Sequence, residues 1–189
     1  MNFNILILLL SSTILFYSCK SGGSEGNTKV SEKNGGTFVM AENSQMGSIY
    51  PISVTNQVEA LIVSQIHESL VRLDSKTLEV IPGLAQKWEI APDGKKITFF
   101  LVKGAHFQDD KCYKEGKGPE ITAKDVLFSL TNISNNTAEN YQFNSLLKDR
   151  LVGANDFFDK KTQTISGIKI IDDYTISLEL VNPSLSFIK

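Results

Sequence analysis

The side chains that could carry out covalent chemistry are few in this sequence, and their spacing does not match a catalytic site. His67-Glu68 begins like the zinc-binding pattern His-Glu-x-x-His, but position 71 is valine. Three protein ligands are the usual minimum for catalytic zinc, and His106 is the only other histidine. We therefore expect His67 to be a surface residue on the polar side of a helix and predict no metal site.

The paired carboxylates and the second cysteine also favour ordinary surface roles. Asp109-Asp110 and Asp172-Asp173 stand in turn-like sequence, whereas acid–base catalysis needs two carboxyls held apart across a substrate. Gly116-Lys-Gly118 lacks the rest of a phosphate-binding loop and predicts a surface turn. Cys112 would need a base nearby in space to act as a nucleophile. We expect no enzyme activity and no cofactor.

Composition places the chain among ordinary globular proteins. It has 189 residues, 41% of them hydrophobic and 21% charged, with 19 basic and 21 acidic side chains and a formal net charge of −2. This balance, with no clustered basic face, argues against nucleic-acid binding.

The N-terminus resembles a bacterial lipoprotein signal. Residues 1–18 carry no charged side chain, are rich in Ile, Leu and Phe, and directly precede Cys19. This length suits a secretory segment better than a membrane span. The resemblance implies lipidation of Cys19, and the polar residues 19–34 would form a flexible tether. The alternative is an ordinary cleaved signal peptide in which Cys19 is incidental.

Periodicity beyond the tether predicts a mixed α and β chain. Apolar residues at helical spacing favour one helix over residues 56–73, ended by Asp74-Ser75. Two short strands are expected around Pro82-Gly83. Residues 91–94 predict a turn that leads into a strand at 95–102 covered on both faces, and the strands on the two sides of this turn are expected to form a hairpin. We assign the tryptophan, Trp88, to the core.

The second half predicts another helix and another hairpin. Thr122 begins a capping-box-like start, and the apolar residues that follow favour a helix ending in the Asn-rich run 132–140. A further short helix is expected within residues 143–153. The alternation of residues 168–180 around Asp172-Asp173 predicts a hairpin.

Several of these runs, taken in order, resemble one known family. They are "GGTFVMAENSQMGSIYP", "HESLVRLDSKTLEVIPGLA", "GLAQKWEIAPDGKKITFFLVKGAHF", "ITAKDVLFSL" and "SGIKIIDDYTISLELVNPSLSFI". The sequence is thereby similar to the extracellular solute-binding proteins of family 5, the oligopeptide- and dipeptide-binding components of ABC importers. The similarity covers roughly residues 35–189. Family members are longer, so the chain resembles an N-terminal piece.

The resemblance implies an α/β fold of the periplasmic-binding-protein class II type, bilobal with an extra small lobe, of which only the N-terminal part is present. In that scheme residues 35–55 begin the first lobe, residues 56–181 form the small lobe, and residues 182–189 return to the first. We expect these residues alone to bind ligand weakly or not at all.

The family resemblance also suggests which residues contact a ligand. It nominates Thr55, Asn56, Gln57 and Tyr141 as ligand-binding candidates. For Tyr141 the alternative is a ring packed under its loop, and for the other three it is a plain surface loop.

The expected function is a lipid-anchored, monomeric binding protein that captures peptides for uptake. Its partners would be a peptide, the permease subunits of an ABC importer, and the membrane through the lipid on Cys19. The expected location is the periplasmic or extracellular face of the cell envelope. The alternatives are a non-transport surface lipoprotein used in adhesion or signalling, and an importer component for another solute such as a nickel chelate or a sugar.

Overall fold

The helices and strands of the described residues lie in the compact unit Glu42–Lys189. The computed structural model describes residues 37, 39, 41 and 45–188, so the predicted signal peptide, Cys19 and the tether lie outside the described residues. Within them, no helix combines the length and apolar character needed to cross a membrane. The α-helices are α2 (Gln57–Ile66), α3 (Ala123–Ile133), α4 (Phe143–Leu146) and α5 (Ala154–Phe158). The strands are β1 (Val71–Leu73), β2 (Val80–Pro82), β3 (Ala85–Ile90), β4 (Lys96–Leu101), β5 (Ile168–Asp172) and β6 (Thr175–Glu179).

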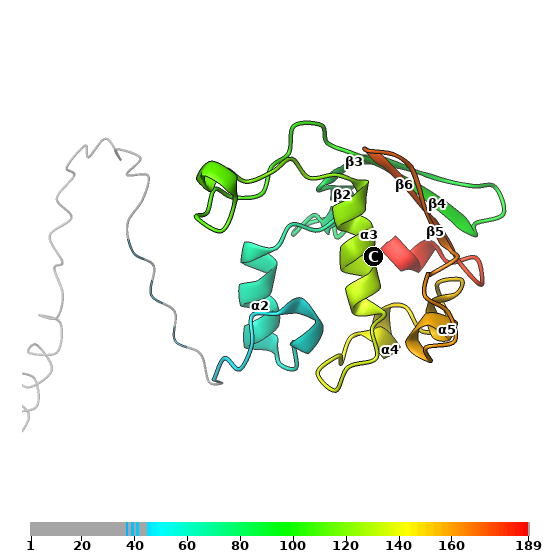
Figure 1. The fold of residues 1–189 in the computed structure, drawn as a ribbon, viewed down its shortest axis with the longest axis horizontal. Coiled ribbons are helices and arrows are strands. Elements are labelled where there is room, and N and C mark those ends of the chain that lie inside the picture. Colours follow the sequence, from blue (N-terminus) through cyan, green and yellow to red (C-terminus); the bar gives the residue numbers. More distant parts are fainter. Residues whose placement is uncertain (1–36, 38, 40, 42–44, 189) are drawn as a thin grey trace, which may run out of the picture. The chain divides into compact units, whose positions relative to one another are not determined.

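A four-stranded antiparallel sheet of order β3-β4-β6-β5 organises the unit (Figure 1). Its two central strands come from hairpins far apart in the sequence. Ile97 pairs with Leu178 and Phe99 pairs with Ile176, so apolar side chains meet directly across the strands. All four of these side chains are buried, and they fix the register because a slip of one residue would expose them.

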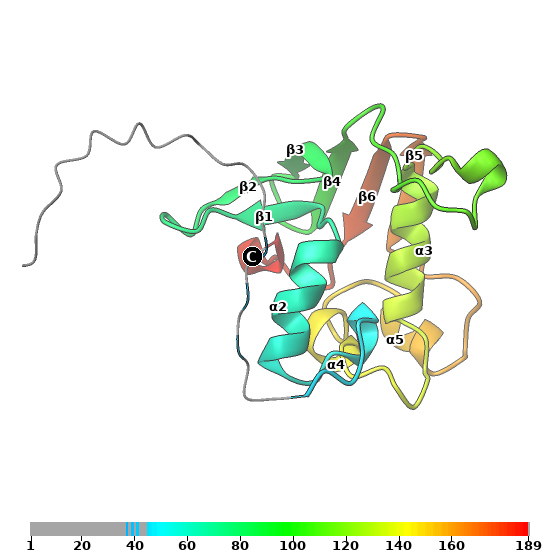
Figure 2. The same cartoon turned by 90° about the vertical axis from the view of Figure 1, so that its left-hand side faces the viewer.

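Helix α3 packs against β5 and β6, and α4 and α5 lie near its C-terminal end (Figures 1 and 2). Its start is the capping arrangement that the sequence predicts. Asp125 Oδ2 accepts the Thr122 backbone N–H at 2.7 Å and the Thr122 hydroxyl at 3.0 Å. Ala123 and Val126 then turn their side chains into the core.

The predicted helix over 56–73 is wrong in its second half. Helix α2 ends at Ile66, and Val71–Leu73 instead forms strand β1, paired with β2. The chain leaves the helix because Ser69 and Leu70 carbonyls accept the N–H groups of Leu84 and Ala85, both at 2.9 Å. These long-range bonds require extended backbone, which the local helical spacing of leucines does not reveal.

Both predicted hairpins are confirmed, but the expected burial of residues 95–102 on two faces is wrong. Ile97, Phe99 and Leu101 are buried, whereas Phe100 on the other face is half-buried under the Lys87 ammonium, 4.1 Å from its ring centroid. On this face the Lys87 side chain covers Phe100, and Val102 is 37% exposed.

Two smaller expectations differ from the structure. Trp88 packs against the core but is only partly buried, because it lies on the edge strand β3. Helix α5 was not predicted at all. It begins after Gly153, whose φ of +78° is a conformation that glycine adopts without strain.

Candidate ligand-binding edge

The four residues nominated for ligand contact lie on two segments that the fold brings together. Residues 51–57 comprise the 3₁₀ turn η2 (Pro51–Ser53) and the start of α2, while Tyr141 lies just before α4. The Tyr141 backbone N–H donates to the Ile52 carbonyl at 3.0 Å. Gln142 Nε2 donates to the Val54 carbonyl at 2.8 Å. Thr55, Asn56, Gln57 and Tyr141, which we call the candidate edge, therefore share one region (Figure 2).

Three members of the candidate edge present polar groups to solvent. Thr55 and Gln57 are exposed, and Tyr141 is 57% exposed. The fourth member, Asn56, has a structural role instead. Its Oδ1 accepts the Glu59 backbone N–H at 3.0 Å, so its side chain caps the N-terminus of α2.

A buried carboxylate that the sequence reading did not single out supports the candidate edge. Glu59 is 3% exposed, and its Oε2 accepts the Thr55 N–H at 2.8 Å. Its Oε1 accepts the Gly47 N–H at 2.9 Å. These N–H groups, that of Thr55 foremost, lower the pKa of Glu59 from 4.5 to about 2, so the carboxylate stays ionised. The spacing Asn56-x-x-Glu59, typical of a helix start, was the available signal.

The carboxylates considered for catalysis lie at exposed positions beside turns and in loops: Asp172 ends strand β5 just before the hairpin turn, and Asp109 lies in the loop after β4. Asp172 Oδ1 accepts the Tyr174 N–H at 2.8 Å, and this bond lowers the pKa of Asp172. Asp109 Oδ2 accepts from Lys117 Nζ at 2.6 Å, which is the main cause of its lowered pKa. Both carboxylates are exposed and both pKa values are lowered, whereas a general acid at neutral pH needs a raised pKa.

The exposed Cys112 thiol is held in a less reactive state. A hydrogen bond with the Asp110 carboxylate raises the pKa of Cys112, which lowers the fraction of nucleophilic thiolate. His67 is exposed and follows α2 as its C-terminal cap. Over the described ranges, the His, Cys, Asp and Glu side chains form no group of three that could hold a metal ion.

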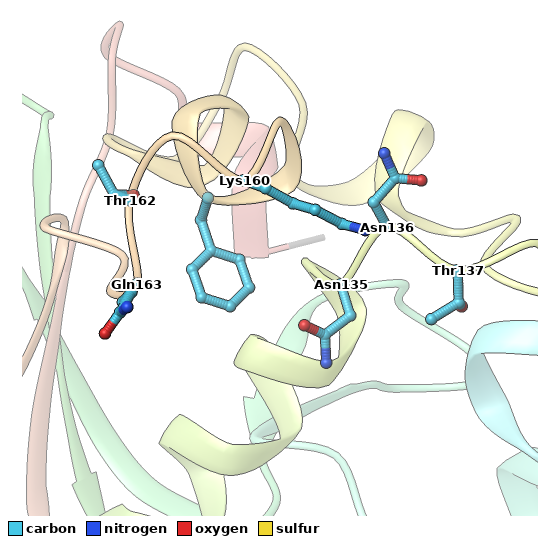
Figure 3. Close-up of a pocket in the computed structure, with 7 residues that line it drawn as sticks. Asn135, Asn136, Thr137, Lys160, Thr162 and Gln163 are labelled. Carbon is cyan, nitrogen blue, oxygen red and sulfur yellow. The ribbon is translucent and has the colours of Figure 1, made fainter.

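A cavity of about 370 Å³ lies between the end of α3 and the segment after α5 (Figure 3). In Figure 3 the Lys160 side chain extends toward Asn136. None of the four residues of the candidate edge lines this cavity. It is lined by Asn135, Asn136, Thr137, Phe157, Lys160, Thr162 and Gln163.

Comparison with known proteins identifies the family. A model of the bacterial extracellular solute-binding proteins, family 5 Middle, matches residues 79–189. The chain belongs to this family. Among curated relatives, the dipeptide-binding protein of Escherichia coli (strain K12) is 34% identical over 125 residues, which are 65% of this chain and 22% of the relative.

Solved structures confirm the fold expected from the sequence. The periplasmic oligopeptide-binding protein OppAIV of Borrelia burgdorferi aligns with a TM-score of 0.65 and 28% identity, over 74% of this chain and 26% of that one. The periplasmic binding protein DppA of Helicobacter pylori, in complex with the peptide STSA, aligns with a TM-score of 0.60 and 29% identity, over 75% and 26%. The chain thus spans about a quarter of the length of these relatives.

Proposed function

We propose that this chain is part of a binding protein that captures peptides for an ABC importer. The observation that carries the proposal is the likeness to a dipeptide-binding protein at 34% identity. A solved relative with the same fold, DppA of Helicobacter pylori, is in complex with a peptide. The protein would act as a monomer, hand its ligand to the permease subunits, and carry out no covalent chemistry.

The candidate edge supplies groups suited to a peptide backbone. A hydroxyl, an amide and a phenol can each donate and accept hydrogen bonds, as the N–H and C=O groups of a peptide require. Gln57 and Tyr141 present an amide and a phenol at the surface, whereas Thr55 is exposed but donates its hydroxyl to Glu59 at 3.2 Å, so this group is left to accept from a ligand. Recognition through the backbone would tolerate varied ligand side chains. Asn56 would contribute mainly by fixing where the α2 helix begins.

Membrane attachment forms a separate part of the proposal. The apolar residues 1–18 followed by Cys19 support cleavage and lipidation at Cys19, which would hold the protein on a membrane at the periplasmic or extracellular face of the cell envelope. Mass spectrometry of the mature protein tests this directly. A diacylglyceryl group on Cys19 is expected, and an unmodified chain beginning at another residue would refute it.

Peptide capture is tested by isothermal titration of the full-length mature protein, with Cys19 removed, against tri- to pentapeptides. We expect saturable binding, and Tyr141→Phe should weaken it about threefold to tenfold by removing one hydrogen bond. Tyr113→Phe is the matched control, because Tyr113 belongs to a different loop, and it should leave the affinity unchanged. A flat titration with the unaltered protein would refute peptide capture.

A further inference from the structure

Glu59 is a buried charge whose partners in the structure are hydrogen-bond donors of one loop. Its carboxylate accepts the backbone N–H groups of Gly47, Ser48 and Thr55 at 2.9, 3.2 and 2.8 Å, and the Thr55 hydroxyl at 3.2 Å. Among the described residues, no lysine, arginine or histidine forms an ion pair with it. A buried carboxylate satisfied by N–H and O–H groups alone ties down the backbone that supplies them.

The two carboxylate oxygens hold opposite ends of the same loop. Oε1 binds Gly47 and Ser48 at its beginning, and Oε2 binds Thr55 at its end, so one side chain closes the segment 47–55. The approach at Gly47 is close. A Cβ atom there would lie 3.0 Å from Oε1, so a larger residue would push the carboxylate away.

The far side of the same loop contacts the other half of the candidate edge. Ile52 accepts the Tyr141 N–H, and Val54 accepts the Gln142 side-chain amide. Glu59 and the 141–142 segment therefore hold the loop from two sides. The loop 47–55 thus links Thr55, which Glu59 holds, to the segment of Tyr141, which bonds to Ile52.

We propose that Glu59 is a positioning residue that closes the loop 47–55 and so fixes the candidate edge before ligand arrives. Groups that already hold their bound conformation lose less conformational entropy when the ligand binds, and this smaller loss raises the affinity. The expected effect of Glu59 on peptide affinity rests on the proposed function. The claim that Glu59 holds the loop 47–55 can be tested without a ligand.

Glu59→Gln is the decisive variant because it keeps the shape and removes the charge. The new NH₂ group would face N–H donors of the loop on one side, so at least one end of the loop must release. The matched control is Val58→Ala, which truncates a neighbouring side chain that is 8% exposed but makes no hydrogen bond to the loop. Both variants are made in the full-length protein.

The first readout is hydrogen exchange at the backbone amides of Gly47, Ser48 and Thr55. We expect Glu59→Gln to accelerate their exchange about tenfold or more, and Val58→Ala to leave it within about threefold, because only the first change opens the loop locally. Unchanged exchange in Glu59→Gln would overturn the inference, whether or not the protein binds peptides.

The second readout is peptide affinity by isothermal titration. Glu59→Gln is expected to weaken binding about tenfold, and Val58→Ala less than about threefold. Faster exchange without a loss of affinity would overturn the positioning role, as would equal losses in both variants. If the unaltered protein bound no peptide, the proposed function would fail, and the exchange result would still decide whether Glu59 holds the loop.

Discussion

Replacing Phe143 by alanine should cost much of the stability of the unit. The ring is 2% exposed and stacks on Phe158, with centroids 4.0 Å apart and planes 5° from parallel. It belongs to the same core cluster as Leu147 and Leu151, which are themselves almost fully buried. Removing a buried ring from such a site typically costs about 3–5 kcal/mol, because the transfer energy is lost and a cavity remains.

Urea unfolding of the chain, followed through the fluorescence of its single tryptophan, measures this cost. With a urea dependence of about 2 kcal/mol per molar, the midpoint should fall by about 1.5–2.5 M. The matched control is Phe128→Ala, because Phe128 is 67% exposed on α3 and its loss should change stability by less than about 0.5 kcal/mol. A cost below about 1 kcal/mol for Phe143→Ala, or equal costs for the two variants, would contradict the burial described for this core.

Three further predictions follow from individual groups. Because the folded-state pKa of Glu59 is lowered to about 2, its contribution to stability is complete above pH 4.5 and is lost as pH falls toward 2. Glu59→Gln should therefore flatten the acid dependence of urea unfolding between those values. Gly118→Ala should cost about 1–3 kcal/mol in the same assay, since a Cβ would collide with the Phe107 carbonyl. Asp110→Asn should speed alkylation of Cys112 near pH 8, measured by mass spectrometry, because the carboxylate that raises the thiol pKa is gone; an unchanged rate would contradict this.

Short-range patterns in the sequence predicted the elements whose causes are local. The hairpin turn at 91–94 forms because Gly94 adopts φ +68° and donates its N–H to Ala91. The start of α3 at Thr122 follows from a side chain three residues later. Each of these depends on residues adjacent in the chain, so spacing alone is informative.

The end of α2 could not be predicted in this way. The leucines at 70 and 73 continue the helical spacing, yet the backbone is extended there because Ser69 and Leu70 bond to Leu84 and Ala85. The order of the sheet is a further example. Strands β4 and β6 are neighbours although more than seventy residues separate them, and only the packed core selects that pairing.

For the candidate edge too, some features could be predicted from the sequence and others depend on the tertiary structure. The sequence by itself, through the family resemblance, determined which residues are candidates for ligand contact: Thr55, Asn56, Gln57 and Tyr141. Tertiary structure decided that residues 141–142 meet the 51–57 segment, through the bond from the Tyr141 N–H to Ile52 and the bond from the Gln142 side chain to Val54. It also decided that Glu59 is buried under that loop, because the burial of a carboxylate depends on donors that only the fold brings within reach.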